Sequence, residues 1–273
     1  MVKILEKEIL VHSSPQVIKM KIKAPLISSK VKPGQFVILM VSPEGERIPL
    51  TVVDKDKESI TLIFQEVGLT TKLLAKLKEK DNLYSLVGPL GRPTPIKNYG
   101  KVVVVGGGVG IGLVYPIIKA LKGKNNIVVS ILGARDKNYL ILKEEIKKFS
   151  DKLFIATDDG SEGEKGFATD ILEKILEEEK FDLVYCVGPI LMMKKVSQIA
   201  RFYNLKTIVS LNPIMVDGTG LCGSCRLLYK GEVKFACCDG PDFDAHSVDF
   251  DDLLRRNRRF EEEERRIYLE EDI

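Results

Sequence analysis

Apolar and polar residues alternate along the first part of the chain. In the stretch "VIKMKIK", the apolar Ile18, Met20 and Ile22 alternate with lysines, and this period of two predicts a half-buried strand. The stretches "GQFVILMV", "LTVVDKDKESITLIFQ" and "NLYSLVGPLG" continue as short strands separated by glycine, proline and charged turns. Several short strands at this spacing predict a small antiparallel β-barrel over residues 1–98.

One helical period interrupts the predicted strands, in the stretch "TTKLLAKLKEK". Leu73, Leu74 and Leu77 recur at helical spacing and share one face. Thr70 or Thr71 is the predicted N-cap, because a hydroxyl oxygen can accept from the first amides of a helix.

The pattern changes at about residue 99, where buried strands begin to alternate with helices. The stretches "KVVVVGGG", "NIVVSILGAR", "KLFIATDDG", "FDLVYCVGP" and "KTIVSL" are apolar enough to be buried on both faces. Helical segments are predicted between them, over residues 112–121, 140–149, 168–178 and 190–202. This alternation predicts a doubly wound parallel sheet over residues 99–210, with strand order 3-2-1-4-5. Residues 211–273 form a cysteine-containing segment and a polar tail.

The composition excludes several functional classes. The chain is 44% hydrophobic and 30% charged, and its formal net charge of +3 gives no basic field suited to nucleic acid. The most apolar run, "KVVVVGGGVGIGLVYPIIKAL", is interrupted by glycines, so no membrane span is predicted. The N-terminal "MVKILEKEIL" lacks the apolar core of a signal peptide, which predicts a cytoplasmic, reducing location.

A glycine-rich turn follows the first strand of the predicted sheet. Gly107, Gly108 and Gly110 permit a tight turn, and the helix after them offers N–H groups to a phosphate. The match to G-x-G-x-x-G is partial, and such glycines can also be purely structural. An acidic ribose ligand about 20 residues further on is not evident. Arg135 instead ends the second strand, near the expected place of an adenosine ribose.

Two more strands end in residues that can face a ligand. Asp158, Asp159 and Gly160 follow the third strand, and Cys186 lies in "CVGP" at the end of the fourth. Ligands bind at the carboxyl edge of open α/β sheets. The alternatives are a solvated acidic turn and a cysteine that serves as a small buried apolar residue.

The barrel region contributes two further candidates. In "RIPLT", which is placed between barrel strands, Arg47 can neutralise a diphosphate and the Thr51 hydroxyl can bond a ring nitrogen. In "GLTT", the stretch from Gly68 to Thr71 precedes the predicted helix. It either presents N–H groups to a pyrophosphate or simply caps that helix.

Four of the five cysteines gather between residues 217 and 241. A disulfide is disfavoured in a reducing compartment. A thioredoxin-like dithiol should open a helix, whereas "RLLYKGEVKFAC" reads as a hairpin with Lys230 and Gly231 at its turn. A zinc site would need a second ligand pair, and the only histidine nearby is His246.

The remaining candidate is an iron–sulfur cluster. Plant-type [2Fe–2S] centres use C-x₄-C-x₂-C and a distant fourth cysteine. With Asp217 in the first position, the spacing D-x₄-C-x₂-C-x₁₁-C runs through Cys222 and Cys225 to Cys237. Glycines between these residues let the backbone wrap closely around a cluster.

The whole chain resembles one family. The stretches "RIPLT", "VGPLGRP", "TDDGSEGEKGFATD", "CVGP" and "MVDGTGLCGSC…FACCDGP" are similar to those of the electron-transfer subunit of dihydroorotate dehydrogenase type B. They are more similar still to those of the small subunit of NADH-dependent ferredoxin:NADP oxidoreductase, or sulfide dehydrogenase.

The resemblance implies a ferredoxin-reductase-like fold with FAD in the barrel, NAD(H) on the sheet and a [2Fe–2S] cluster in the C-terminal segment. The cluster ligands implied are Asp217, Cys222, Cys225 and Cys237, with Cys238 as a neighbour only. Asp217 favours the ferredoxin:NADP subunit, because the dihydroorotate-type subunit has a cysteine there. One departure from related reductases is that Arg47 precedes Thr51 by four positions instead of three.

The resemblance also assigns the nucleotide sites. Thr51 and Cys186 are the implied catalytic residues, near the flavin N5 and the nicotinamide. The implied cofactor-binding residues are Arg47, Pro49, Leu50, Thr51, Phe64, Gln65, Gly68, Thr70, Thr71, Gly107, Gly108, Gly110, Arg135, Asp158, Asp159, Gly160, Gly188 and Pro189. NAD rather than NADP follows from the resemblance alone, because Arg135 can also meet a 2′-phosphate.

The implied partner is a larger flavoprotein with a second FAD and [4Fe–4S] clusters, which uses NADP(H) and ferredoxin and bifurcates electrons in a heterodimer. Three alternatives remain: the dihydroorotate dehydrogenase subunit, a non-catalytic flavin- and metal-binding module, and a zinc protein. The tail over residues 255–273 pairs Glu and Arg at helical spacing, as a solvated helix or a partner-docking segment would.

Overall fold

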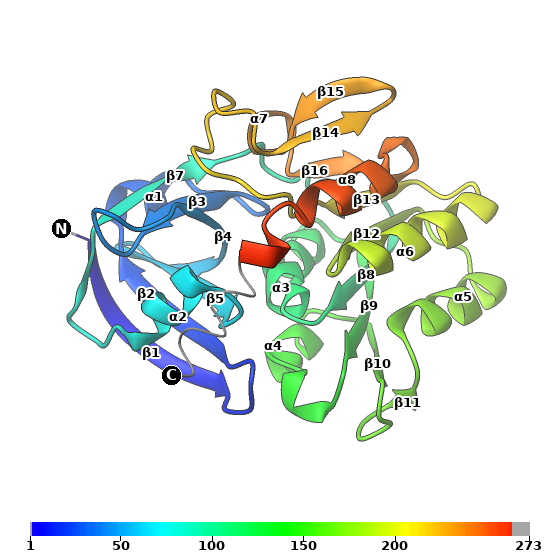
Figure 1. The fold of residues 1–273 in the computed structure, drawn as a ribbon. Coiled ribbons are helices and arrows are strands. Elements are labelled where there is room, and N and C mark those ends of the chain that lie inside the picture. The colour runs from blue at the N-terminus through cyan, green and yellow to red at the C-terminus, as the bar shows by residue number, and fades with distance from the viewer. Residues whose placement is uncertain (1, 264–273) are drawn as a thin grey trace.

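The computed structural model describes residues 2–263 and contains two seven-stranded sheets and a two-stranded hairpin (Figure 1). The strands are β1 (Val2–Val11), β2 (Val17–Lys23), β3 (Phe36–Met40), β4 (Ile48–Lys55), β5 (Ser59–Gln65), β6 (Asn82–Leu83), β7 (Ser85–Leu90), β8 (Lys101–Gly107), β9 (Ile127–Ala134), β10 (Lys152–Thr157), β11 (Glu164–Lys165), β12 (Leu183–Val187), β13 (Thr207–Ser210), β14 (Arg226–Tyr229), β15 (Glu232–Phe235) and β16 (Asp242–Asp244). The helices are α1 (Pro25–Lys30), α2 (Leu69–Lys76), α3 (Gly110–Lys122), α4 (Lys143–Lys147), α5 (Ala168–Glu178), α6 (Ile190–Phe202), α7 (Ala236–Asp239) and α8 (Phe250–Asn257), with 3₁₀ turns at η1 (Lys137–Tyr139) and η2 (Ala245–Ser247).

The first sheet is a nearly closed antiparallel barrel in the order β6-β1-β2-β5-β4-β3-β7. The alternation predicted from the sequence sets its register: Ile18, Met20 and Ile22 of β2 are buried inside, and the lysines between them lie on the outer face. This confirms the predicted barrel. The stretch "RIPLT" was expected between strands, but β4 already begins at Ile48 and includes most of it.

The N-cap of α2 lies two or three residues earlier than predicted. The N-cap is Gly68, not Thr70 or Thr71. The Thr71 hydroxyl acts from the first turn instead, accepting the Gly68 N–H at 2.9 Å and donating to the Gly68 carbonyl at 2.9 Å. Leu74 is fully buried under the barrel, as the apolar face of the helix predicts.

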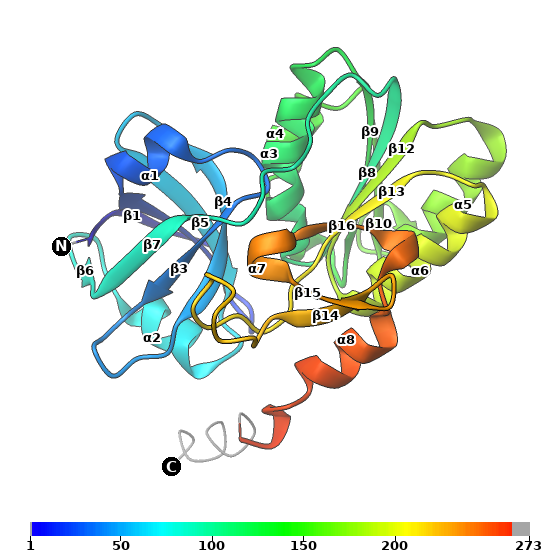
Figure 2. The ribbon, with the colours of Figure 1, turned by 90° about the horizontal axis from the view of Figure 1, so that it is seen from above.

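The second sheet has the order β11-β10-β9-β8-β12-β13-β16. Its parallel strands β10, β9, β8, β12 and β13 confirm the predicted order 3-2-1-4-5. Helices α3 and α4 cover the face toward the barrel, and α5 and α6 cover the opposite face (Figures 1 and 2). The helix predicted over residues 140–149 is shorter than expected: it is α4 over Lys143–Lys147, because Leu142 before it adopts a left-handed conformation (φ 52°).

The C-terminal segment lies across the junction of barrel and sheet (Figure 2). Hairpin β14–β15 turns at Lys230 (φ 53°) and Gly231 (φ 77°), and two positive φ angles are typical of a type I′ turn. Strand β16 then adds to the edge of the second sheet, antiparallel to β13. The cysteine segment is therefore built into the central sheet and is not a separate appendage.

The buried carboxylate of Asp242 joins the C-terminal segment to the second sheet and to the chain that connects the barrel with that sheet. Asp242 of β16 accepts a hydrogen bond from Thr94, in the connection between barrel and sheet, at 2.6 Å, and another from Tyr185 of β12 at 3.1 Å. Burial raises the pKa of Asp242 to about 6, although hydrogen bonds from Thr94, Ser210 and Tyr185 favour the ionised form.

This carboxyl predicts a pH-dependent stability. Its pKa is higher in the folded chain than its ordinary value of 3.8, so the folded chain holds the proton more tightly and stability falls as pH rises from about 4 through about 6. Between pH 5 and 7 the wild type should lose on the order of 1 kcal/mol of unfolding free energy through Asp242. Asp242→Asn should lack this slope in denaturant titrations at the two pH values. Equal slopes for the two proteins would contradict the assignment.

Candidate functional site

A cleft of about 420 Å³ opens between the barrel, the carboxyl edge of the second sheet and the chain that follows β13. The sheet wall comes from the ends of β8 and β12, the two neighbouring strands at which the order 3-2-1-4-5 reverses. Such switch points are where open α/β sheets bind ligands. The predicted site residues that line this cleft are Pro49, Leu50, Thr51, Phe64, Gln65, Thr71, Gly107, Gly108, Gly110, Gly188 and Pro189.

The barrel wall of the cleft combines apolar surface with two polar side chains. Strand β4 brings Thr51 opposite Phe36 of β3, and the end of β5 supplies Gln65. A cleft that is mostly apolar, with a few placed hydroxyl and amide groups, is typical of sites for planar cofactors. These residues fit a flavin ring.

The sheet wall depends on glycines that approach one another closely. A Cβ at Gly107 would lie 2.4 Å from Met192 Sδ, and a Cβ at Gly188 would lie 2.4 Å from Met192 Cε. A Cβ at Gly110 would lie 2.5 Å from the Val187 carbonyl oxygen. Gly108 differs from these, because its φ of 57° favours glycine and nothing lies within 4 Å of its Cβ position. The backbone at Gly108 is thus open to a ligand, as a dinucleotide site requires.

Cys186 does not reach the cleft. It is fully buried, and desolvation raises the pKa of its thiol well above the ordinary range. Successive residues of a strand face opposite sides of the sheet, so Val187 lines the cleft and Cys186 packs into the core on the other face. The expectation that Cys186 is catalytic is therefore corrected.

A second cavity, of about 750 Å³, adjoins the first. The residues that line both are Pro49, Val67, Thr71, Asn212, Pro213 and Met215. Arg47 and the start of α2 line the second cavity, including Gly68 and Thr70. The first amides of a helix have no partner within the helix and suit a phosphate. The Thr70 hydroxyl is already bonded to Glu46, at 2.9 Å.

Arg135, at the end of β9, and the acidic loop over residues 158–160, at the end of β10, lie outside both cavities. Arg135 is held by the barrel: Nη2 donates to the Ser14 carbonyl at 2.9 Å, and the guanidinium lies 4.1 Å from the ring centre of Tyr139. The Tyr139 hydroxyl bonds the Pro15 carbonyl at 2.9 Å. These contacts of Arg135 and Tyr139 with the β1–β2 turn also explain the position of Arg135 at the sheet edge.

The acidic loop is stabilised mainly by hydrogen bonds between its own residues. The Asp159 carboxylate accepts from the Ser161 N–H at 2.9 Å. Hydrogen bonds from the Ser161 side chain, and then from its backbone, lower the pKa of Asp159. Gly160 adopts a φ of 79° in the turn. Because β8, β9 and β10 are parallel, Asp158, Asp159 and Gly160 share the carboxyl edge with the glycine turn, although they do not line the cleft.

One wall of the first cavity, formed by the chain that follows β13, was not predicted from the sequence. Residues 210–215 connect β13 to the cysteine loop and line the first cavity through Ser210, Leu211, Asn212, Pro213 and Met215. The available signal was their position, because they follow the fifth strand at the ligand-binding edge.

Two of the four predicted cluster ligands already lie together. The buried Cys225 and Cys237 have their sulfur atoms 3.2 Å apart. Cys222 is exposed, and its N–H donates to the Asp217 carboxylate at 2.8 Å. Hydrogen bonds from the Thr219 and Cys222 amides lower the pKa of Asp217. Within residues 2–263, however, no three Cys, His, Asp or Glu side chains converge closely enough to hold a metal ion as they stand.

The donor set and the loop still fit an iron–sulfur cluster. Gly218, Gly220 and Gly223 all have positive φ angles, so the loop can curve around the thiols. Burial and the neighbouring Cys225 raise the pKa of the Cys237 thiol. His246 is engaged elsewhere, with its ring Nε2 2.8 Å from the Leu205 carbonyl oxygen. Its position does not support the zinc alternative.

Arg92, in the stretch that leaves the barrel, holds the turn that carries Cys237. Its Nε donates to the Cys238 carbonyl at 2.9 Å, and its guanidinium lies 3.4 Å from the Asp239 carboxylate. Asp239 in turn accepts the Phe235 N–H at 2.9 Å and closes the α7 turn. The barrel is thereby connected to the thiol-bearing turn.

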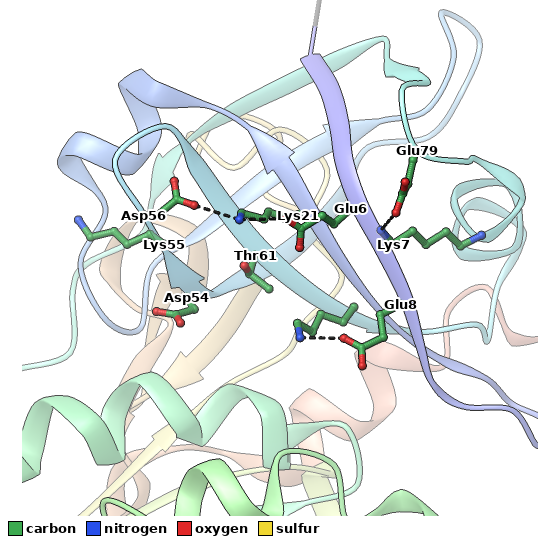
Figure 3. A pocket seen from close by; sticks show the side chains of 10 residues that line it. Glu6, Lys7, Glu8, Lys21, Asp54, Lys55, Asp56, Thr61 and Glu79 are labelled. Carbon is green, nitrogen blue, oxygen red and sulfur yellow. Dashed lines mark hydrogen bonds and ion pairs between the residues drawn. The ribbon is translucent and has the colours of Figure 1, made fainter.

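A further pocket on the outer face of β1, β2 and β5 is a network of surface charges (Figure 3). Lys21 lies 3.1 Å from Glu6 and 3.2 Å from Asp56, and Lys19 lies 2.8 Å from Glu8. The charges pair with one another in a solvated setting, so we assign no ligand to this pocket.

Comparison with known proteins agrees with this geometry. Residues 212–249 match the iron–sulfur cluster binding domain of dihydroorotate dehydrogenase B, and residues 104–198 match the oxidoreductase NAD-binding domain. The chain is 49% identical to a dihydroorotate dehydrogenase B (NAD(+)) electron transfer subunit homolog of Thermotoga maritima, over 90% of this chain and 88% of that protein. The chain belongs to the family of dihydroorotate dehydrogenase B electron transfer subunits.

Solved structures extend the likeness. A chain of an NADH-dependent reduced ferredoxin-NADP oxidoreductase superposes with a TM-score of 0.93 at 45% identity, over 99% of this chain and 97% of that chain. Ferredoxin-NADP+ reductase from Plasmodium falciparum shares the fold, with a TM-score of 0.61 at 18% identity over 73% of this chain and 88% of that chain. The ferredoxin-reductase-like fold is confirmed.

The chain is therefore an oxidoreductase subunit of the electron-transfer type. FAD, an iron–sulfur cluster and NAD(H) are the cofactors that its fold and its two matched domains imply. Among the described residues, no helix is both long and apolar enough to cross a membrane.

Gly110 provides a test of the sheet wall. Gly110→Ala places a Cβ against the Val187 backbone, which cannot move aside without shifting the cleft, so we expect a loss of about 1–3 kcal/mol in unfolding free energy and weaker NADH binding. Gly123→Ala is the matched control at the other end of α3. The φ of −64° at Gly123 suits alanine, and a Cβ there would lie 3.4 Å from the Ala120 carbonyl oxygen, an ordinary contact. Denaturant unfolding and NADH titration should separate the two variants. A Gly110→Ala protein as stable as the control would show that this close approach is unimportant.

Proposed function

We propose that this chain is the NAD(H)-linked small subunit of an electron-bifurcating, NADH-dependent reduced ferredoxin:NADP oxidoreductase. The observation that carries the proposal is the match to a chain of such an enzyme over 99% of this chain at 45% identity. Asp217 agrees with it, because the resemblance implies a cysteine at this position in a dihydroorotate-type subunit. The proposed division is a flavin domain over residues 1–98, an NAD domain over 99–210 and a cluster segment over 211–273.

In the cleft, the proposal assigns the flavin to the barrel wall and the nicotinamide to the glycine wall. Bound FAD would exchange a hydride with NAD(H) and pass the electrons on singly. The Thr51 hydroxyl would hold a ring nitrogen of the flavin, and Gly108 would let the dinucleotide backbone approach. Leu50, Phe64 and Leu211 supply apolar surface that keeps water from the reacting atoms.

For the cluster, the proposed ligands are Asp217, Cys222, Cys225 and Cys237 of a [2Fe–2S] centre. The paired thiols of Cys225 and Cys237 support one half of this set. Asp217 and Cys222 support the other half, since their loop positions are already linked by a hydrogen bond. Met215 lines the cleft only two residues before Asp217, so the chain itself connects the flavin site to the cluster loop.

The proposed partner is a larger flavoprotein with a second FAD and [4Fe–4S] clusters, linked to NADP(H) and ferredoxin. The competing assignment is an electron transfer subunit that serves dihydroorotate oxidation. It is favoured by the 49% identical relative, which is described as a dihydroorotate dehydrogenase B (NAD(+)) electron transfer subunit homolog, and by the matched iron–sulfur domain.

Purification of the native complex under anaerobic conditions tests the two assignments. The proposal expects a co-purifying flavoprotein and NADH-dependent exchange of electrons with both NADP⁺ and ferredoxin. Formation of orotate from dihydroorotate, coupled to NAD⁺ reduction, would replace the proposal with the competing assignment. A preparation without flavin or acid-labile sulfide would refute both.

Thr51 should affect the hydride step. In Thr51→Ala the flavin loses a hydrogen-bonding partner, so we expect flavin reduction by NADH to slow about tenfold or more in stopped-flow measurements. Thr51→Ser keeps the hydroxyl and should retain most of the rate. Equal rates in all three proteins would remove Thr51 from the mechanism.

Asp217 should affect the cluster. A carboxylate is a harder ligand than a thiolate, so Asp217→Cys is expected to change both the EPR spectrum and the midpoint potential of the reduced cluster. Cys238→Ser is the control, because Cys238 is proposed only as a neighbour and its removal should leave the spectrum unchanged. If Asp217→Cys leaves both quantities unchanged, Asp217 is not a ligand.

A further inference from the structure

The matched iron–sulfur domain ends at residue 249, and the structure describes a further helix and turn up to residue 263. Helix α8 packs on α6 through the buried Leu253 and an ion pair of 2.6 Å between Lys194 and Asp251. Residues 258–263 then lead from α8 toward the barrel (Figures 1 and 2). We call residues 250–263 the C-terminal strap.

The strap is attached to the chain around both cavities. Arg256 Nε donates to the Arg226 carbonyl at 3.0 Å, and Arg259 Nη2 donates to the Ser224 carbonyl at 3.1 Å. These two bonds hold it to the cysteine loop. Asn257 Nδ2 donates to the Asn212 carbonyl at 3.1 Å, and Asn212 lines both cavities.

These attachments bring Phe260 to the cavity of about 750 Å³. Phe260 is the single aromatic residue among the described residues that line this cavity, and the residue is 48% exposed. The same cavity holds Arg47 and the start of α2, and its other walls include the apolar Met40 and Ile48. An exposed aromatic ring next to a phosphate-binding arrangement is suited to a nucleoside base.

The two adjoining cavities together match the parts of a flavin dinucleotide. The first has the walls expected for a flavin ring, and Thr71, at the start of α2, lies on its border with the second. A dinucleotide with its ring in the first cavity and its diphosphate beside Arg47 and α2 must place its nucleoside in the rest of the second cavity. We infer that the C-terminal strap is part of the FAD site and that Phe260 contacts the adenine of FAD.

This inference rests on the proposed FAD site and assigns its adenosine half. It makes one discriminating prediction, because FMN has the same flavin ring as FAD but no adenosine. Base–aromatic contacts of this kind change affinity by about tenfold or more when the ring is removed. Phe260→Ala should therefore weaken FAD binding by that factor and leave FMN binding unchanged.

The experiment uses the full chain, with dissociation constants for FAD and FMN measured by flavin fluorescence after removal of the native flavin. Phe260→Trp should retain FAD affinity. Phe202→Ala is the control, since Phe202 is 85% exposed at the end of α6 and lines neither cavity. Far-UV circular dichroism checks that each variant is folded.

The outcomes separate the inference from the proposed function. Unchanged FAD affinity in Phe260→Ala, or an equal loss for FAD and FMN, overturns the inference while the flavin site stands. A wild-type chain that binds neither flavin overturns both. A selective loss of FAD affinity in Phe260→Ala, with Phe202→Ala unchanged, supports the inference.

Discussion

The arrangement of the site depends on the close approach of two turns at the carboxyl edge of the second sheet. Gly107 and Gly188 pack against Met192, and Gly110 packs against the Val187 carbonyl, at distances that leave no room for a side chain. Because these turns occupy so little space, a cleft forms at the switch point of the sheet. The barrel can then supply the opposite wall of the cleft through Thr51.

The C-terminal part of the chain completes this cleft while holding the cysteine loop beside it. Residues 210–215 and Pro241 line the cleft on either side of the loop, and β16 fixes the return of the chain to the sheet. The buried Asp242 then ties β16 to Tyr185 and Thr94. A cysteine segment anchored at both ends to the sheet keeps a constant position relative to the flavin side, which suits electron transfer between two centres.

Local patterns were sufficient for the elements and for much of the site. The alternation around Met20 predicted the barrel, the strand–helix alternation predicted the sheet order, and the residue pair at Lys230 predicted the hairpin turn. The same period of two, applied to β12, would have placed Val187 rather than Cys186 at the cleft. Contacts between distant segments were not predictable in this way. The hydrogen bond between Arg135 and the β1–β2 turn joins residues more than 100 positions apart. The C-terminal strap lies beside its cavity because of contacts with distant residues, such as that of Asn257 with Asn212, which no local pattern indicates.

The attachments of Arg135 and Arg92 have a mechanical consequence. Arg135 fastens the β1–β2 turn to the end of β9, while Arg92 fastens the exit of the barrel to the α7 turn. These hydrogen-bonded attachments, at two different parts of the barrel, oppose a hinge movement of the barrel relative to the sheet. The width of the cleft between the barrel wall and the glycine wall would then be set by the resting fold instead of by closure around each ligand.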